Sequence, residues 1–285
     1  MKNFKGKTAV ITGAGNGFGA EFAKEAAMRE MKLVLADIDG NDLERTINAC
    51  KKLGAECIAL TMDVSVYDNV KAMIKSAVDT YGTIDLLINN AGVAVGGVIW
   101  ETPVQDYEWT SGINVMAQVY AMHEAIPIMM KQGTECHIVN VASVAGVITS
   151  IGISAYHMSK HASVALAESV MYDLQAAGAK IGMSVYCPGF VQTDLHNYER
   201  HRPERYAKGD DPYYKSEAYQ KVLLRATQAV TTGMPIDSAG MSVFTAIEDD
   251  QFYILTHPIY FPLIGVRCRD ILEGRTPSIN NLPGR

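Results

Sequence analysis

The chain has 285 residues, 48% of them hydrophobic, and a formal net charge of −6, which suits one large globular α/β domain. The mild acidic excess and the lack of a basic cluster argue against nucleic acid as a partner. The five cysteines follow no metal-ligand spacing and fit reduced thiols of a cytosolic protein, so no metal site is expected. No signal peptide and no apolar stretch of membrane-spanning length is found, so we expect a soluble cytoplasmic protein without a membrane partner.

A glycine-rich turn follows the first apolar run. Residues 8–12 are rich in β-branched side chains, and a helix-favouring segment at 20–29 begins directly after the turn Gly13-Ala14-Gly15-Asn16-Gly17-Phe18-Gly19. Strand, glycine turn and helix in this order form the context that a dinucleotide-binding loop requires. Glycines let the backbone approach a pyrophosphate, whose charge is stabilised at the helix N-terminus. An ordinary turn could have this composition too, so the motif depends on the rest of the chain.

A second apolar run, at 33–37, ends in Asp37. A carboxylate about 20 residues past a glycine loop is placed to accept hydrogen bonds from the adenosine ribose, and it repels a 2′-phosphate. Its neighbours Ala36 and Ile38 are apolar and Asn16 is neutral, so no adjacent cation would receive a phosphate. We therefore predict NAD(H) rather than NADP(H). The alternative is that Asp37 only begins the turn at 37–40.

Short apolar runs alternate with helix-favouring segments along most of the chain. Further strands are predicted at 56–62, 84–88, 137–141, 180–186 and 252–256, and helices at 41–53, 65–81, 103–131, 216–232, 236–248 and 267–273. This alternation predicts a single Rossmann-type domain over residues 1–285, a doubly wound parallel sheet of about seven strands with helices on both faces. Ligands of such sheets bind beyond the carboxyl ends of the strands. Several polar or glycine positions fall at that edge: Gly13, Asp37, Asp63, Asn90 and Ser143.

Three residues, on the predicted helix at 103–131 and on another predicted from residue 154 through 164, carry side chains that a helix does not itself require. Asn114 lies in the middle of the segment 103–131, where asparagine is unfavourable unless its side chain has a task, such as bonding to backbone. Tyr156 and Lys160 are four residues apart, so they share one helix face. An ammonium beside a phenol favours the phenolate, which would bring proton exchange nearer to neutral pH. An ordinary pair on a solvated face has the same spacing.

Residues 194–220 are polar, interrupted by proline, and contain Tyr198, Tyr206, Tyr213, Tyr214 and Tyr219. Long irregular segments in compact domains are usually functional, so we expect a substrate lid here. The tyrosines could line a substrate pocket or pack at an oligomer interface, and both settings are rich in this residue. Residues 257–285 form a C-terminal extension with a tail rich in proline and glycine.

Together these motifs resemble those of the classical short-chain dehydrogenases/reductases, over residues 5 to about 258. The resemblance rests on Thr12-Gly13-x-x-x-Gly17-x-Gly19, Asp63-Val64, Asn89-Asn90-Ala91-Gly92, Asn114, Ser143, Tyr156-x-x-x-Lys160 and Pro188-Gly189-x-Val191-x-Thr193. It implies that the loop (Gly13, Asn16, Gly17, Phe18, Gly19) binds the cofactor at its pyrophosphate and that Asp37 binds the ribose. Asp63, Val64, Asn90, Ala91 and Gly92 would flank the adenine and adjacent ribose, and Val191 and Thr193 would hold the nicotinamide carboxamide. Phe18 stands where Ile or Leu is usual, which should affect packing only.

By the same resemblance, Tyr156 is the expected catalytic acid/base. Lys160 would lower its pKa and bind the nicotinamide ribose, Ser143 would donate a hydrogen bond to the substrate oxygen, and Asn114 would hold a water that links Lys160 to solvent. The implied reaction interconverts a secondary alcohol and a ketone by hydride transfer with NAD(H). Family members are usually homotetramers, with dimers next.

The substrate is the least determined part of this interpretation. The tyrosines and the apolar loop at 93–98 favour a hydrophobic small molecule, and a hydroxysteroid or bile acid, a small cyclic ketone and an acyl-chain ketone all fit. A non-catalytic dinucleotide-binding sensor or scaffold on the same fold is the main alternative, although such proteins typically lose a member of the catalytic tetrad. A methyltransferase would have no use for Tyr156 and Lys160, and an epimerase of the extended branch has differently spaced glycines.

Overall fold

The computed structural model describes residues 1–279, which contain a seven-stranded parallel sheet in the order β3-β2-β1-β4-β5-β6-β7. The strands are β1 (Thr8–Thr12), β2 (Lys32–Asp37), β3 (Cys57–Thr61), β4 (Leu86–Asn89), β5 (Cys136–Val141), β6 (Ile181–Cys187) and β7 (Tyr253–Leu255). The chain proceeds outward from β1 to β3 and then crosses back to β4, so the topological switch point lies between β1 and β4. The predicted doubly wound sheet is confirmed.

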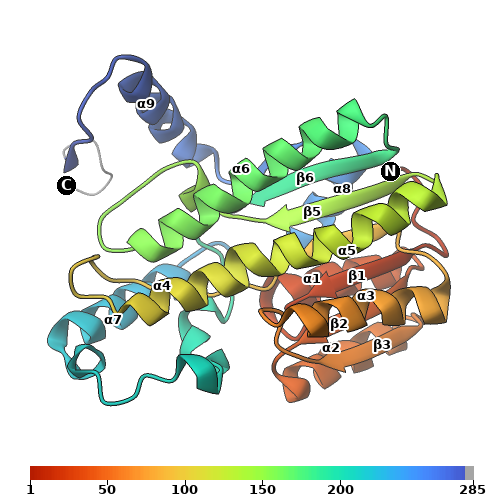
Figure 1. Cartoon of the computed structure of the whole chain (residues 1–285), viewed down its shortest axis with the longest axis horizontal. Coiled ribbons are helices and arrows are strands. Elements are labelled where there is room, and N and C mark those ends of the chain that lie inside the picture. The colour runs from red at the N-terminus through yellow and green to blue at the C-terminus, as the bar shows by residue number, and fades with distance from the viewer. Residues whose placement is uncertain (280–285) are drawn as a thin grey trace.

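Helices cover both faces of the sheet. Successive strand residues point to opposite sides, and both sides carry apolar side chains that the helices bury. In β1, Val10 packs into one apolar core with α3 (Tyr67–Tyr81), α5 (Ala117–Gln132) and α6 (Ser154–Ala176). Its neighbour Ile11 packs into the other core with α1 (Gly17–Met28), α2 (Gly40–Lys52) and α8 (Ala239–Glu248). Figure 1 shows α5 and α6 side by side across one face of the sheet. The two cores hold the strands' carboxyl ends in a fixed array.

The long helix expected at 103–131 is broken into three parts. It consists of α4 (Val104–Ser111), a π-helical turn at Gly112–Met116, and α5. Asn114 lies inside the π-helical turn, and such turns are frequent at functional sites because they re-aim side chains. The sequence placed Asn114 correctly within the helix but did not predict the change of pitch there.

The segment 194–220 is called here the tyrosine segment. It is held together by the ion pairs of Arg202 with Asp106 and Glu199, called here its polar core. It forms three short 3₁₀ turns, Leu195–His201, Glu204–Tyr206 and Pro212–Lys215, and then enters α7 (Glu217–Thr231). Arg202 pairs with Asp106 at 2.7 Å and with Glu199 at 2.8 Å. The rings of Tyr213, Tyr214 and Tyr219 meet edge to face with centroids 5.3–5.6 Å apart. Three of the five tyrosines therefore pack against one another inside the segment.

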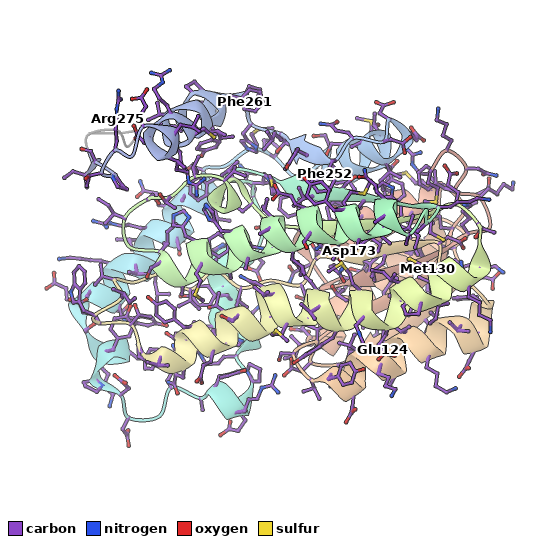
Figure 2. All side chains as sticks on the ribbon, turned by 45° about the horizontal axis from the view of Figure 1, so that its top comes forward. Glu124, Met130, Asp173, Phe252, Phe261 and Arg275 are labelled. Atoms are coloured by element: carbon purple, nitrogen blue, oxygen red, sulfur yellow. The ribbon has the colours of Figure 1, made fainter. Side chains whose placement is uncertain are left out.

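The C-terminal extension carries α9 (Phe261–Leu272), which begins earlier than the helix expected at 267–273. None of its residues is fully buried, and Figure 2 shows the helix at the edge of the molecule, with Phe261 at its start and Arg275 in the segment that follows it. Among residues 1–279, no helix combines the length and the apolar character needed to cross a membrane.

Candidate active site

The glycine loop joins β1 to α1 at the switch point. Gly13 and Gly17 have φ values of +61° and +53°, which favour glycine, and a Cβ on Gly19 would lie 2.0 Å from the carbonyl oxygen of Gly13. The first hydrogen bond of α1 runs from the amide of Ala20 to the carbonyl of Asn16 at 3.2 Å. Within the described chain this leaves the amides of Gly17, Phe18 and Gly19 without partners, at the positive end of the helix dipole. The loop therefore fits a pyrophosphate.

Asp37 ends β2 and is nearly buried. One carboxylate oxygen accepts from the amide of Gly15 at 2.7 Å, and the other accepts from the amide of Asp39 at 2.9 Å. These bonds fix the carboxylate beside the glycine loop, where it can also accept from a ribose hydroxyl. The residues thus fit the adenosine part of a dinucleotide.

The side chain of Asn90 holds the glycine loop in place. Its amide nitrogen donates to the carbonyls of Thr12 at 3.0 Å and Gly13 at 2.9 Å, and its backbone amide donates to the hydroxyl of Thr12. This side chain therefore joins the ends of β1 and β4 across the switch point. Phe18 packs on Phe22 and edge-on against Tyr186, a packing role as expected for this departure from the family pattern.

One cavity of about 1020 Å³ runs along the carboxyl edge of the sheet. All the predicted site residues line this cavity except Gly19 and Asn114. Gly19 is packed against the backbone of Gly13, and Asn114 lies behind Gly92. The predicted residues on its wall are Gly13, Asn16, Gly17, Phe18, Asp37, Asp63, Val64, Asn90, Ala91, Gly92, Ser143, Tyr156, Lys160, Val191 and Thr193.

Ser143, Tyr156 and Lys160 meet on one wall of this cavity. Ser143 follows β5, and its hydroxyl accepts from the amide of Ala145 at 3.1 Å. Tyr156 and Lys160 lie one turn apart on α6, and the Lys160 Nζ is 5.6 Å from the centre of the Tyr156 ring. The ammonium donates to the carbonyl of Val141 at 2.9 Å. A hydroxyl, a phenol and an ammonium thus face one space.

Burial is the largest cause of the pKa shifts of Tyr156 and Lys160. It raises the pKa of Tyr156 to about 12, against a smaller lowering by the hydrogen bond from Ser143. It also lowers the pKa of Lys160 to about 8, because a buried ammonium loses its hydration. The raised pKa of Tyr156 is opposite in direction to the lowering expected from Lys160. A further positive charge beside the phenol would lower the pKa of Tyr156.

The side chain of Asn114 makes three hydrogen bonds to its neighbours. Its oxygen accepts from the amide of Val93 at 2.9 Å, and its nitrogen donates to the carbonyl of Val93 and to the hydroxyl of Ser159, both at 2.9 Å. A Cβ on Gly92 would lie 3.3 Å from the Asn114 oxygen and 3.6 Å from the Lys160 Nζ. Asn114 therefore fixes the chain after β4 next to Lys160.

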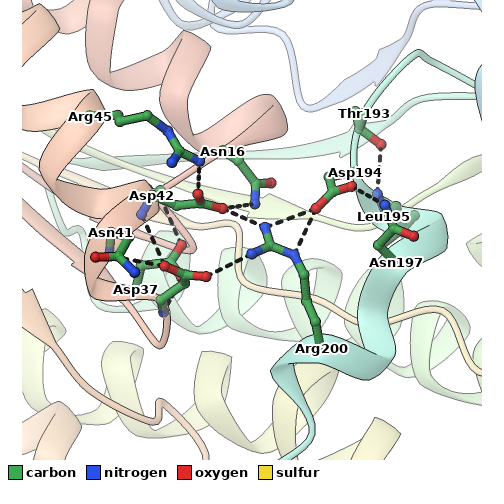
Figure 3. A network of polar contacts seen from close by, with 12 residues as sticks. Asn16, Asp37, Asn41, Asp42, Arg45, Thr193, Asp194, Leu195, Asn197 and Arg200 are labelled. Carbon is green, nitrogen blue, oxygen red and sulfur yellow. Dashed lines mark hydrogen bonds and ion pairs between the residues drawn. The ribbon is translucent and has the colours of Figure 1, made fainter.

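An arginine cluster that the sequence did not indicate lies close to Asp37, at the ribose side of the cavity (Figure 3). Arg200, from the tyrosine segment, pairs with Asp39 at 2.6 Å, with Asp194 at 2.8 Å and with Asp42. Asp42 also pairs with Arg45 and accepts from the side chain of Asn16 at 2.9 Å. The sequence argument considered only the chain neighbours of Asp37, whereas Arg200, which is distant along the chain, pairs with Asp39, two residues beyond Asp37.

The rest of the cavity lies between α7, α9 and the loops that follow β4 and β5, and its lining is mostly apolar with several charged side chains on α7 and α9. Tyr198 and Tyr213 are the tyrosines of the tyrosine segment that line it. These two residues are thus placed as the pocket alternative predicts, and Tyr213 also packs with Tyr214 and Tyr219 within the segment. A large apolar volume next to the phenol and the hydroxyl suits a hydrophobic small molecule.

Comparison with known proteins agrees with this geometry. A family model described as short chain dehydrogenase matches residues 7–204. A CLA biosynthesis dehydrogenase/reductase from Lactiplantibacillus plantarum is 49% identical over 284 residues, which cover 100% of this chain and 99% of the relative. Estradiol 17-beta-dehydrogenase 11 of Mus musculus is 35% identical over 193 residues, covering 67% of this chain and 64% of the relative.

A solved structure has the same fold over almost the whole chain. It is the crystal structure of a short-chain dehydrogenase/reductase from Burkholderia phymatum in complex with NAD, with 40% sequence identity, a TM-score of 0.94 and 98% of each chain covered. The resemblance drawn from the motifs is confirmed by these matches. This chain belongs to the short-chain dehydrogenase family and, with it, to the oxidoreductases.

Proposed function

We propose that the protein is an NAD(H)-dependent oxidoreductase that interconverts a secondary alcohol and a ketone on a hydrophobic substrate. The observation that carries this proposal is the meeting of Ser143, Tyr156 and Lys160 on the wall of one cavity that also contains the glycine loop. The NAD in the Burkholderia phymatum structure supports the choice of cofactor. Relatives named 1-deoxy-11-beta-hydroxypentalenate dehydrogenase and estradiol 17-beta-dehydrogenase support a cyclic alcohol or ketone as one substrate type.

The residues of the chain would divide the work as follows. In oxidation, Tyr156 as phenolate takes the alcohol proton, and Ser143 donates a hydrogen bond to the substrate oxygen; in reduction, Tyr156 returns the proton. Lys160 supplies a positive charge next to the phenol, and Asn114 holds the backbone beside Lys160 and is the expected site of a relay water. When bound, the nicotinamide would exchange the hydride and, when oxidised, add positive charge beside the phenol.

The cofactor would lie along the carboxyl edge of the sheet. The free amides of the first turn of α1 would bind its pyrophosphate, and Asp37 its ribose. Asp63, Val64, Ala91 and Gly92 would flank the adenosine, with Val191 and Thr193 at the carboxamide. The carboxylate of Asp37 next to the ribose supports a preference for NAD(H) over NADP(H).

The substitution Tyr156→Phe tests the chemistry while sparing the fold. We expect it to abolish turnover while NADH binding, measured by fluorescence titration, stays unchanged. Tyr172→Phe is the matched control, because Tyr172 lies on the same helix and is 70% exposed. The assay is NADH absorbance over a panel of cyclic and acyclic alcohols and ketones, in both directions. Turnover retained in Tyr156→Phe would contradict the proposal, and NADH binding without turnover by the wild-type protein on any substrate would favour a sensor.

Two further expectations accompany this function. We propose that the tyrosine segment acts as the substrate lid, because Tyr198 and Tyr213 line the cavity and Arg200 reaches across to the ribose side. Assembly into a homotetramer, with a dimer as the next choice, stays a prediction that light scattering on the purified protein would test.

A further inference from the structure

The outer part of the cavity has two helical walls with the same design. On α7, Ala218, Val222, Ala226 and Ala229 line the cavity at helical spacing, and Arg225 lies within this apolar stripe. On α9, the lining residues are Leu263, Val266, Arg267, Asp270 and Ile271, again one helix face. Each wall is thus an apolar stripe with one arginine in it.

Charge in this part of the cavity is mostly positive, although the whole chain has a net charge of −6. Four basic side chains line it, Lys221, Arg225, Arg267 and Arg275, against the two acidic side chains of Glu101 and Asp270. The protein's own carboxylates neutralise two of the four. Lys221 pairs with Glu217 at 2.6 Å, and Arg275 pairs with Asp270 at 3.8 Å and with Glu273.

The other two cations are Arg225 on α7 and Arg267 on α9. Over residues 1–279, neither Arg225 nor Arg267 forms an ion pair or a side-chain hydrogen bond. Arg267 is half-buried, and its charge acts on His161 of α6, which places it toward the body of the molecule and not only toward solvent. Guanidinium groups bind carboxylates through paired hydrogen bonds, which makes such a side chain a selective receptor for a carboxylate.

We propose that the substrate is an amphipathic carboxylate, whose alcohol or ketone carbon lies at Ser143 and Tyr156, whose apolar body lies between α7 and α9, and whose carboxylate binds Arg225 and Arg267. This rests on the proposed function. A long-chain hydroxy acid and a hydroxylated steroid acid share this chemistry. The apolar stripes account for the body, and Arg225 and Arg267, which have no ion-pair partner among residues 1–279, account for the charged end.

An arginine stem can also cover apolar surface while its charged head remains in water, and this is the competing explanation. It predicts no difference between a charged substrate and its neutral ester. Binding a carboxylate predicts a large difference, because a hydrogen bond to a charged group contributes about 1.5–3 kcal/mol, or roughly 10- to 150-fold in kcat/KM.

The test compares each acid with its methyl ester. For the wild-type protein we expect kcat/KM for the acid to exceed that for the ester by about tenfold or more, mostly through KM. In Arg225→Gln and Arg267→Gln this ratio should fall toward one with kcat little changed, and Arg→Lys at each position should restore part of it. Arg269→Gln is the control, since Arg269 is an exposed α9 residue that does not line the cavity. Equal kinetics of acid and ester in the wild type, or equal loss in Arg269→Gln, would overturn the proposal.

Two further arms separate the possible results. Long-chain hydroxy acids with the hydroxyl at different positions, and hydroxylated steroid acids, show which apolar body the cavity accepts, because only one hydroxyl position should fit a fixed carboxylate. Calorimetric titration with a saturated fatty acid, which has no alcohol, measures carboxylate binding without turnover. Binding that depends on Arg225 and Arg267 would support the site even if no alcohol is oxidised, whereas turnover of neutral alcohols without acid preference would uphold the proposed function and overturn this inference.

Discussion

The polar core of the tyrosine segment should contribute strongly to stability, and Arg202→Met tests this. The side chain of Arg202 is 6% exposed and that of Asp106 is 0% exposed, and the two are 2.7 Å apart. Asp106 also accepts from the hydroxyl of Tyr214 at 2.8 Å. The guanidinium lies 4.1 Å from the centre of the Trp109 ring. Methionine keeps most of that apolar contact, so the substitution mainly removes the charge.

Removing one partner of a buried ion pair costs about 3–5 kcal/mol, because the other charge is left without compensation. Glu199, the second partner, is 20% exposed and can be hydrated, so we expect the lower end, about 3 kcal/mol. That corresponds to a change of roughly 150-fold in the folding equilibrium. The pKa of Glu199, now held low by its hydrogen bond to Arg202 despite burial, should rise.

The assay is equilibrium unfolding in urea, followed by circular dichroism and not by fluorescence, because Trp109 contacts the altered residue. Lys75→Met is the control: Lys75 and Asp79 form an exposed pair on α3, and its loss should not shift the midpoint measurably. Asp106→Asn in the Arg202→Met background should recover part of the loss, since it removes the unpaired charge. A destabilisation below about 1 kcal/mol would contradict a strong contribution of this ion pair, because it would place the pair in the range of surface ion pairs.

Three further outcomes are expected. Burial raises the pKa of Tyr156 to about 12, so alcohol oxidation, which needs the phenolate, should accelerate from about pH 6 to about pH 9. Ketone reduction, which needs the phenol, should not accelerate over this range. NADH absorbance measures both rates, and a flat oxidation profile would contradict the role of Tyr156 as acid/base. Gly19→Ala should abolish NADH binding in a fluorescence titration, because its Cβ would lie 2.0 Å from a carbonyl oxygen of the loop; unchanged binding would show that the loop is not used. Asp37→Ala should reduce the preference for NADH over NADPH, and faster turnover of NADPH than NADH by the wild type would make that interpretation of Asp37 wrong.

The sheet could be predicted because its signals are local. Each strand is a short apolar run, and each helix begins close to a glycine or polar boundary, so a doubly wound parallel sheet and its shared carboxyl edge follow from general rules of parallel sheets. The residues at that edge, among them Asp37, Asn90 and Ser143, follow from the same rule. The π-helical turn at Asn114 could not be predicted, since no periodicity in residues 103–131 marks the change of pitch.

Interactions between segments that are distant along the chain could not be predicted from the sequence. Arg202 and Asp106 are 96 positions apart, and nothing in the pattern of either segment indicates that they pair. The tyrosines of residues 194–220 were expected to serve either a pocket or an interface, whereas several of them instead complete the core that Arg202 organises. The walls formed by α7 and α9 depend in the same way on how the C-terminal extension packs, which composition does not determine.

Cofactor preference depends on charges that are close in space as well as on those close in the chain. The sequence favours NAD because Asp37 has no cation beside it in the chain, yet the structure brings Arg200 and Arg45 to Asp42, close to the same loop. Arg200 already pairs with three carboxylates, and one of them, Asp42, is only 4% exposed. A 2′-phosphate that recruited Arg200 would leave Asp42 with less compensation in a buried site and would add charge next to Asp37. The preference for NAD is therefore expected to depend on Asp42 as well as on Asp37, and Asp42→Asn should strengthen NADPH binding in a calorimetric titration. If Asp42→Asn left NADPH binding unchanged, Arg200 would have no part in cofactor choice and Asp37 alone would account for it.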